Sequence, residues 1–303
     1  MQNAPKSAPG TTPTAPTTTP TTAPAAPTTT PATPTTAPTA STPPKKVLVV
    51  SAHPEPRSLN GALAGFAVDR LRVAGHEVRV SDLYAMKWKA GLDADDFPDR
   101  LPDDRLDVLA GQERATLAGR LTDDVAAEQE KLLWSDALVL QFPMWWFSVP
   151  AILKGWIDRV FTNGFAYGPS VPPPYSEGAL GGRRALVSVT IGARGTAFSD
   201  RGIHGDLGSV LHPVQHGLLW FTGIRPLEPF AVYGTVDLSE ERFAAAKEAY
   251  ARRLDGLFTD EPVPYRSLTG GDYDHDMRLL PGVEEAGTRG LDLHVRPVPP
   301  TRA

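Results

Sequence analysis

The chain has 303 residues and a formal net charge of −5, with 30 basic and 35 acidic side chains. No block of like charge predicts a nucleic acid or an anionic membrane as partner, and no stretch approaches the ~20 apolar residues that span a bilayer. The absence of cysteine excludes disulfides, cysteine nucleophiles and cysteine-ligated metals, and it favours a cytoplasmic location.

Composition divides the chain into three parts. Residues 1–44 are almost only Thr, Pro and Ala, which predicts a disordered tail, with a glycosylated or surface stalk as the alternative. The tail lacks the apolar core of a secretory signal. Residues 45–260 have the length of one large domain, and residues 261–303 are predicted to form an extended arm across that domain or across a dimer partner.

Three elements are expected at the start of the domain. Residues 46–52 form a continuous apolar run, which is typical of a central parallel strand buried on both faces. A helix is predicted over 58–74, with Ser58 as its N-cap and Gly75 as its stop. A second strand follows at 78–83.

The middle of the chain is less regular. Residues 93–120 are polar and rich in aspartate, so at most short helices are expected there. An amphipathic helix over 123–134 leads into an apolar strand at 137–140. After an aromatic loop, apolar residues recur at i, i+3, i+4 and i+7 over 149–161, which predicts a helix with one buried face.

The second half of the domain begins with a Gly- and Pro-rich excursion at 163–182. A buried strand is predicted at 184–191 and a helix over 206–221. A fifth strand at 228–233 and a final helix over 239–258 complete the domain.

Strands that alternate with helices predict an α/β fold with a doubly wound, five-stranded parallel sheet and helices on both faces. Five strands suggest the flavodoxin-like order 2-1-3-4-5, whose switch point lies between strands 1 and 3. Ligands bind in α/β proteins at such a point, beyond the carboxyl ends of the strands. The loops 53–60 and 143–147 are therefore expected to be neighbours in a ligand site.

The second of these loops carries Trp145, Trp146 and Phe147 in a row after a buried strand, which packing alone explains poorly. An aromatic and uncharged loop suits a flat conjugated ring. Aromatic residues are also common in cores and interfaces, so core or interface packing stays an alternative for all three and is favoured for Trp145.

Four stretches are informative together: AHPEPRSLN at 52–60, AEQEKL at 127–132, QFPMWWFSVPAILKGWIDRVF at 141–161, and RGIHGD at 201–206. In combination they resemble the NAD(P)H:quinone oxidoreductases (DT-diaphorases) and their bacterial relatives, over about residues 46–260. The resemblance implies a homodimer with a flavodoxin-like fold that binds FAD. It also implies NADPH or NADH as cosubstrate and a small-molecule quinone as acceptor, in a two-electron ping-pong reaction.

The resemblance assigns three groups of residues. His204 matches the catalytic histidine that acts on charge developing on the flavin. The residues implied to bind the cofactor are His53, Ser58, Asn60, Pro143, Met144, Trp146, Phe147, Thr190 and Gly192. The residues implied to line the quinone pocket are Tyr167, Phe221, Trp146 and Phe147.

Some residues depart from the family pattern. The catalytic tyrosine of the family, six residues before the histidine, is Phe198 here, and phenylalanine cannot donate a proton. The loop after the fourth strand reads TIGARG in place of a Thr-Thr-Gly-Gly type run, and a second pocket tyrosine is Pro169. Flavin binding is therefore expected to carry over better than quinone specificity.

Other interpretations remain open. His53 is alternatively a loop histidine without a ligand, and His204 is alternatively a helix cap. His212 and His216 have the i, i+4 spacing of metal ligands, but no third ligand accompanies them, so no metal is predicted. For the whole chain, the alternatives are an FMN-dependent azo- or nitro-reductase of the same fold, a flavodoxin-type electron carrier and a flavin-free scaffold.

Overall fold

The structure is a computed structural model that describes residues 43–101 and 103–297. The segment 1–44, predicted to be a disordered tail, lies outside the described residues except for Pro43 and Pro44.

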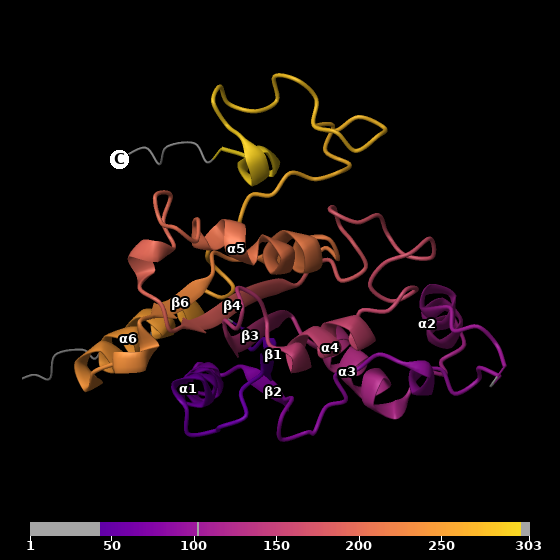
Figure 1. Ribbon diagram of the computed structural model, residues 1–303, viewed down its shortest axis with the longest axis horizontal. Helices are drawn as coiled ribbons and strands as arrows, with labels where there is room; N and C mark the ends of the chain where they lie inside the picture. Colours follow the sequence, from indigo (N-terminus) through magenta and orange to yellow (C-terminus); the bar gives the residue numbers. More distant parts are fainter. Residues whose placement is uncertain (1–42, 102, 298–303) are drawn as a thin grey trace, which may run out of the picture. The chain divides into compact units, whose positions relative to one another are not determined.

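A parallel sheet forms the centre of the domain (Figure 1). Its strands are β1 (Lys46–Ser51), β2 (Glu77–Asp82), β3 (Ala137–Pro143), β4 (Arg184–Ile191), β5 (Arg225–Pro226) and β6 (Phe230–Tyr233). The strand order is β2-β1-β3-β4-β5, and β6 also pairs with β4. The predicted order 2-1-3-4-5 is confirmed.

The last position of the sheet differs from the prediction of one strand at 228–233. Two short strands occupy it: Pro226 of β5 pairs with Ala185, and Phe230 of β6 pairs with Ser188 further along the same neighbour. Pro226 and Pro229 have no backbone N–H to donate, which explains why the ladder to β4 is interrupted between the two strands.

In residues 43–101 and 103–297 the α-helices are α1 (Leu59–Val73), α2 (Val108–Leu117), α3 (Asp123–Trp134), α4 (Ala151–Val160), α5 (Leu207–Val214) and α6 (Glu240–Asp255). Buried side chains of α1 and α6 pack with one face of β1 and β3, whereas those of α3, α4 and α5 pack with the other face. The helix predicted over 206–221 is α5 continued by a π-helical turn, η3 (Gln215–Trp220), which follows Pro213. Helices on both faces are therefore confirmed.

The start and the end of α1 follow the predicted signals. Ser58 is the N-cap, and its side chain accepts a hydrogen bond from the backbone N–H of Gly61 at 3.1 Å. Gly75 follows the helix with φ of 87°, a conformation that glycine adopts without strain. The cap fixes where the loop after β1 turns into the helix.

Residues 261–297 form an irregular arm with a single 3₁₀ turn, Gly290–His294, drawn in yellow in Figure 1. The arm is organised by Arg266, which is 4% exposed and donates hydrogen bonds to the carbonyls of Val283 and Leu293. The indole N–H of Trp220 donates to the carbonyl of Arg266 at 3.0 Å. The arm therefore packs on η3 of its own chain.

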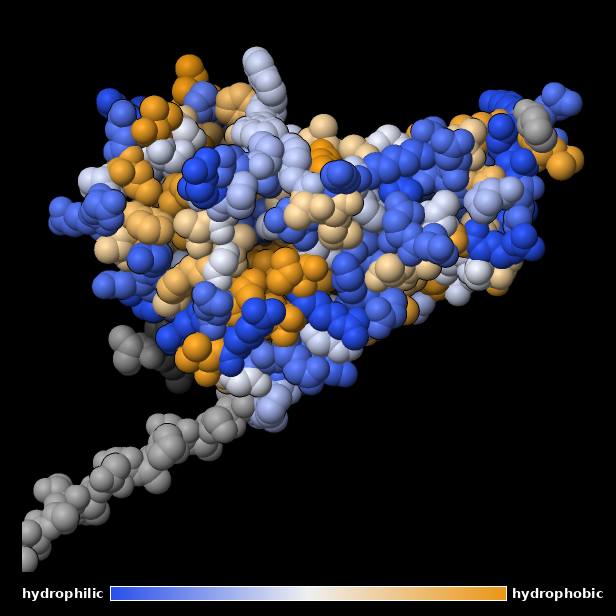
Figure 2. All heavy atoms as spheres, turned by 90° about the horizontal axis from the view of Figure 1, so that it is seen from below, coloured by the Kyte–Doolittle hydropathy of each residue, from blue (hydrophilic) through white to orange (hydrophobic). Residues whose placement is uncertain are grey.

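Over the described part of the chain, every helix is too short or too polar to cross a bilayer. The face in Figure 2 has hydrophilic and hydrophobic residues side by side, which is ordinary for the surface of a folded domain.

Candidate functional site

The loops after β1 and β3 meet at the carboxyl edge of the sheet. The rings of His53, after β1, and Trp145, after β3, have centroids 6.1 Å apart. The two strands are paired up to Ser51 and Gln141, so their loops leave the sheet side by side. The prediction that these loops are neighbours is confirmed.

The first loop closes tightly on the start of α1. The Nδ1 atom of His53 lies 2.9 Å from the hydroxyl oxygen of Ser58 and accepts the backbone N–H of Glu55 at 3.0 Å. A Cβ atom on Gly61 would lie 2.1 Å from the carbonyl oxygen of Pro56, so only glycine fits there. The loop therefore holds His53 and Ser58 beside a helix N-terminus, which favours an anion such as a phosphate.

Two buried amides beneath this loop have unused hydrogen-bonding atoms. The Nδ2 atom of Asn60 donates to the hydroxyl of Thr190 at 3.1 Å, but its Oδ1 atom has no partner in the described chain. Gln141 of β3 likewise has neither amide atom paired among these residues. Leaving a buried polar group unpaired costs about 1–3 kcal/mol, so such groups indicate water or a ligand. The Asn60 acceptor fits a hydroxyl or another donor of a ligand.

The aromatic loop after β3 is a strained two-residue turn. Trp145 and Ser148 exchange both backbone hydrogen bonds at 3.1 Å, and the residues between them, Trp146 and Phe147, have φ of 51° and 58°. A two-residue turn with this backbone conformation favours the sequence Asn-Gly. Each aromatic residue held in the left-handed conformation costs roughly 1–2 kcal/mol of conformational free energy. Trp146 is also 95% exposed. Strain combined with exposure of an indole is typical of a binding site rather than of a packing element.

The residues before the aromatic turn are fixed to β4. Pro143, the last residue of β3, is buried and opposite Thr190 of β4. The N–H of Met144 donates to the carbonyl of Thr190 at 2.9 Å. Gly192 lies just beyond β4, where an added Cβ would meet only Val236, at an ordinary 3.7 Å. Packing within the described chain therefore does not explain the glycine.

His204 lies against the aromatic turn. Its ring meets Phe147 edge-on with centroids 4.9 Å apart, and Phe198 packs beside it at 5.0 Å. The alternative that His204 caps a helix is wrong, because the N-cap of α5 is Asp206, which accepts the N–H of Ser209 at 2.8 Å. Burial alone would raise the pKa of Asp206, but hydrogen bonds from Ser209 and from backbone N–H groups that include Gly208 together outweigh burial and lower it.

Tyr167 and Phe221 form a separate group. Their ring centroids are 6.2 Å apart, and Phe221 also meets Tyr175 edge-on at 5.1 Å. The Tyr167 hydroxyl donates to the side-chain oxygen of Gln112 at 3.3 Å, and burial raises the pKa of that phenol. In residues 43–101 and 103–297, no ring contact joins this group to His204. That Tyr167 and Phe221 line a quinone pocket together with His204 across a dimer interface stays a prediction.

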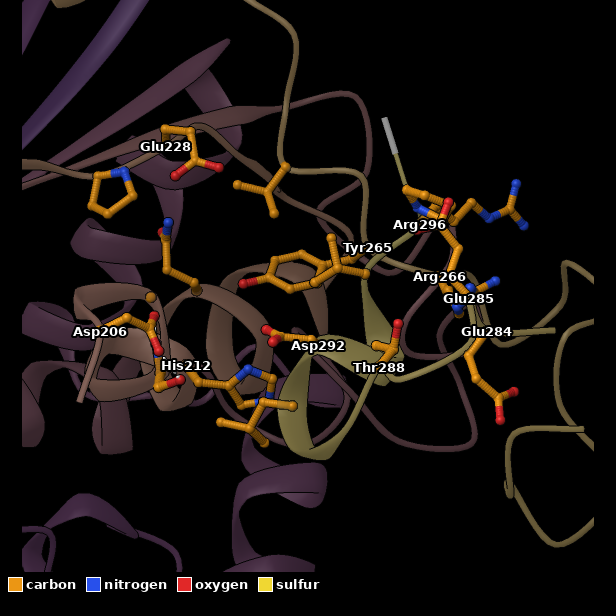
Figure 3. Close-up of a pocket in the computed structure, with 18 residues that line it drawn as sticks. Asp206, His212, Glu228, Tyr265, Arg266, Glu284, Glu285, Thr288, Asp292 and Arg296 are labelled. Carbon is orange, nitrogen blue, oxygen red and sulfur yellow. Dashed lines mark hydrogen bonds between the residues drawn. The ribbon is translucent and has the colours of Figure 1, made fainter. Parts of the chain in front are cut away.

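A hollow of about 420 Å³ lies elsewhere, between α5 and the C-terminal arm (Figure 3). Figure 3 shows His212, Tyr265 and Asp292 around it. Burial and the charge of Glu228 raise the pKa of Tyr265 to about 12. None of the residues predicted to bind a cofactor or substrate lines this hollow. Within the described ranges, no three His, Cys, Asp or Glu side chains are grouped to hold a metal ion.

Two further aromatic residues lie at the candidate site. Trp145, for which core or interface packing was favoured, is 41% exposed and lies beside His53, so interface packing stays a prediction for it. Tyr233, the last residue of β6, packs beside Phe198 with centroids 5.8 Å apart and was not singled out. Its position at the carboxyl end of a strand was the available signal.

Comparisons with known proteins agree with this fold. The family model of the flavodoxin-like fold matches residues 45–254. A ribosyldihydronicotinamide dehydrogenase-like protein of Penicillium crustosum is 44% identical over 234 residues, which cover 75% of this chain and 86% of that protein. The NAD(P)H dehydrogenase [quinone] 1 of Cavia porcellus is 37% identical over 220 residues, which cover 72% of this chain and 79% of that protein. A solved structure described as a quinone reductase from Klebsiella pneumoniae has 45% identity and a TM-score of 0.80, and the match covers 83% of this chain and 100% of that one.

Proposed function

The chain belongs to the flavodoxin-like family of NAD(P)H dehydrogenases (quinone) and is an oxidoreductase, and on this premise we propose that it reduces quinones by two electrons with FAD as cofactor. A bound flavin would supply the hydride chemistry between NADPH or NADH and the quinone, in which one hydride from the nicotinamide and one proton from solvent would give the hydroquinone. Two-electron transfer avoids semiquinone radicals, so the proposed role is detoxification.

The first loop would hold the ribityl and phosphate part of the cofactor. The observation that carries this proposal is the capped N-terminus of α1 beside His53 and Ser58, with the unpaired Oδ1 atom of Asn60 beneath it. Free N–H groups in the first turn donate to a phosphate, and an amide oxygen accepts from a hydroxyl. Thr190 positions Asn60 through their hydrogen bond.

The second loop would hold the conjugated ring. Trp146 and Phe147 present apolar faces outside the core, and Pro143, Met144 and Gly192 place backbone at the same edge of the sheet. His204, in edge contact with Phe147, would stabilise charge that develops on the ring during hydride transfer. An imidazole carries an N–H in its neutral form and in its protonated form, so either form can donate a hydrogen bond to that charge.

Tyr167 and Phe221 would complete the quinone pocket of the partner subunit in a homodimer. Within one chain they stand apart from His204, but they form a half-buried aromatic pair that suits a flat acceptor. A quinone would occupy the ring face that the nicotinamide leaves, which requires ping-pong kinetics.

The test is to purify the full chain, record its visible spectrum and identify the released flavin by chromatography, before and after NADPH is added. Bound FAD that is bleached by NADPH, and recovers its colour with a quinone, is expected. Bound FMN would overturn the FAD assignment and favour an azo- or nitro-reductase. Bound flavin that NADPH does not bleach would favour a flavodoxin-type electron carrier. If the protein binds no flavin even after reconstitution, the remaining interpretation is a flavin-free scaffold.

A further inference from the structure

An aromatic cluster surrounds the candidate histidine. Phe147, Phe198, His204 and Tyr233 are connected ring to ring, with centroid distances between 4.9 and 6.4 Å. Two of its four members, His204 and Tyr233, carry a polar hydrogen. Of these two polar groups, His204 provides an imidazole and Tyr233 provides a phenol.

The position of Tyr233 is tightly fixed. As the last residue of β6 it is paired with Ile191 of β4, so its ring lies next to the loop that follows β4. A Cβ atom on Gly195 of that loop would lie 3.2 Å from the Tyr233 ring. The guanidinium of Arg242 donates to the Tyr233 carbonyl at 2.8 Å, and the N–H of Gly234 donates to the carbonyl of Ala193 at 2.8 Å.

The hydroxyl of Tyr233 is available to a ligand. Tyr233 lines a hollow of about 360 Å³ together with Gly192, Gly195 and Arg242. The ring is partly buried, and in the part of the chain that the structure describes the hydrogen bond from Arg242 goes to the Tyr233 carbonyl while the hydroxyl has no partner. Burial raises the pKa of this phenol, so it keeps its proton at neutral pH and remains a donor.

We propose that Tyr233 donates a hydrogen bond from its phenol to the bound flavin, on the side of the ring that faces the loop after β4. The inference deepens the proposed function and depends on it. Phe198 lies between Tyr233 and His204 and offers no donor. The phenol of Tyr233 on one side of Phe198 and the imidazole of His204 on the other would therefore both act on the cofactor. A neutral donor aimed at the flavin stabilises the reduced form more than the oxidised form, because reduction places negative charge on the ring.

The experiment compares the holoprotein with its Tyr233→Phe variant. The substitution keeps the ring that packs on Gly195 and Phe198 and removes only the hydroxyl. The expected result is a midpoint potential about 30 mV more negative, which is a tenfold loss of preference for the two-electron reduced flavin. The visible spectrum of the oxidised flavin is expected to shift, while flavin content and melting temperature stay as in the parent protein.

Tyr265→Phe is the matched control, because it removes a partly buried phenol from the C-terminal arm, away from the flavin loops. An unchanged potential in Tyr233→Phe, or an equal shift in Tyr265→Phe, overturns the assignment of Tyr233. Absence of flavin from the parent protein would instead refute the proposed function, so the two failures are distinguishable.

Discussion

The ring of Phe147 meets the ring of His204 edge-on, with centroids 4.9 Å apart. The contact links two loops that are far apart in sequence, the strained turn after β3 and the loop before α5. It places the imidazole, through Phe147, at the loop proposed to hold the flavin ring, and the first prediction follows from it.

His204→Ala is expected to slow reduction of the flavin by NADPH by about 10²-fold while the flavin stays bound, since general acid–base or charge-stabilising groups contribute on that scale. Stopped-flow absorbance of the holoprotein measures the rate. Ile203→Ala is the control, because Ile203 is the adjacent residue and is 90% exposed. Equal reduction rates in His204→Ala and the parent protein would remove His204 from the mechanism.

Trp146→Gly is expected to stabilise the fold while it weakens flavin binding. A left-handed tryptophan costs roughly 1–2 kcal/mol, whereas glycine costs about 0.5–1 kcal/mol through the entropy of the unfolded chain. The difference predicts a gain of up to about 1.5 kcal/mol in the free energy of unfolding of the apoprotein, measured by urea titration. Flavin affinity, measured by fluorescence, is expected to fall because an aromatic face is lost.

Met277→Gly is the matched control for this trade-off. Met277 also has a positive φ, 62°, and is 65% exposed, but it lies in the C-terminal arm. We expect a similar gain in stability with unchanged flavin affinity. If Trp146→Gly binds flavin as tightly as the parent protein, Trp146 has no place in the cofactor site.

Local signals explain why much of the fold was predictable. The strand predicted at 184–191 has the bounds of β4, because every residue of that strand after Arg184 is buried and the run is continuous. The N-cap at Ser58 and the turn at Gly75 are set by one or two residues each. Once strands 1 and 3 were identified, the rule for ligand sites in α/β sheets predicted the two loops of the candidate site, and the structure places these loops side by side.

Contacts between distant segments explain what the sequence did not show. The split of the last strand depends on how Pro226 and Pro229 meet the β4 ladder, which appears only once the strands are paired. The left-handed backbone of Trp146 and Phe147 runs against the preference of both residues, so no propensity predicts it. The proximity of Tyr233 to Phe198 joins β6 to a loop in another part of the chain.

The packing of the C-terminal arm is expected to depend on pH. His216 stacks on His212 and Tyr175 with centroids 4.6 Å away, and Tyr265 and His294 of the arm lie at 4.9 and 5.9 Å. Burial, followed by the charges of the two other histidines, lowers the pKa of His216 from 6.5 to about 4. Burial, followed by the charge of Arg266 in the arm, likewise lowers the pKa of His294.

The sign of the effect follows from proton linkage. Between pH 6.5 and 4 the unfolded chain binds a proton at this histidine and the folded chain does not, so stability falls as pH falls through that window. Below about pH 4 both states are protonated and the loss is complete. The loss is on the order of 1–2 kcal/mol, allowing for solvent screening of a ring that is not fully buried.

His216→Phe keeps an aromatic ring in the stack and is expected to flatten the dependence of stability on pH between 6.5 and 4. Urea titrations at a series of pH values measure it. His275→Phe is the control, since His275 has a side chain that is 91% exposed and carries no such burial. A parent profile that is already flat in this window would show that His216 is accessible to protons in the folded state.

Ser58→Ala is expected to affect both stability and cofactor binding, because one hydroxyl serves both. The Ser58 side chain caps α1 through Gly61 and lies 2.9 Å from Nδ1 of His53. Loss of the cap costs about 1 kcal/mol in the free energy of unfolding, and the freed His53 ring is expected to weaken flavin affinity by several fold.

Ser239→Ala is the control, because it removes the equivalent cap of α6, where the Ser239 hydroxyl accepts the N–H of Arg242. This variant is expected to lose the same stability without loss of flavin affinity. Urea titration and flavin fluorescence separate the two effects, and equal flavin affinity in both variants would show that the Ser58–His53 contact serves the fold alone.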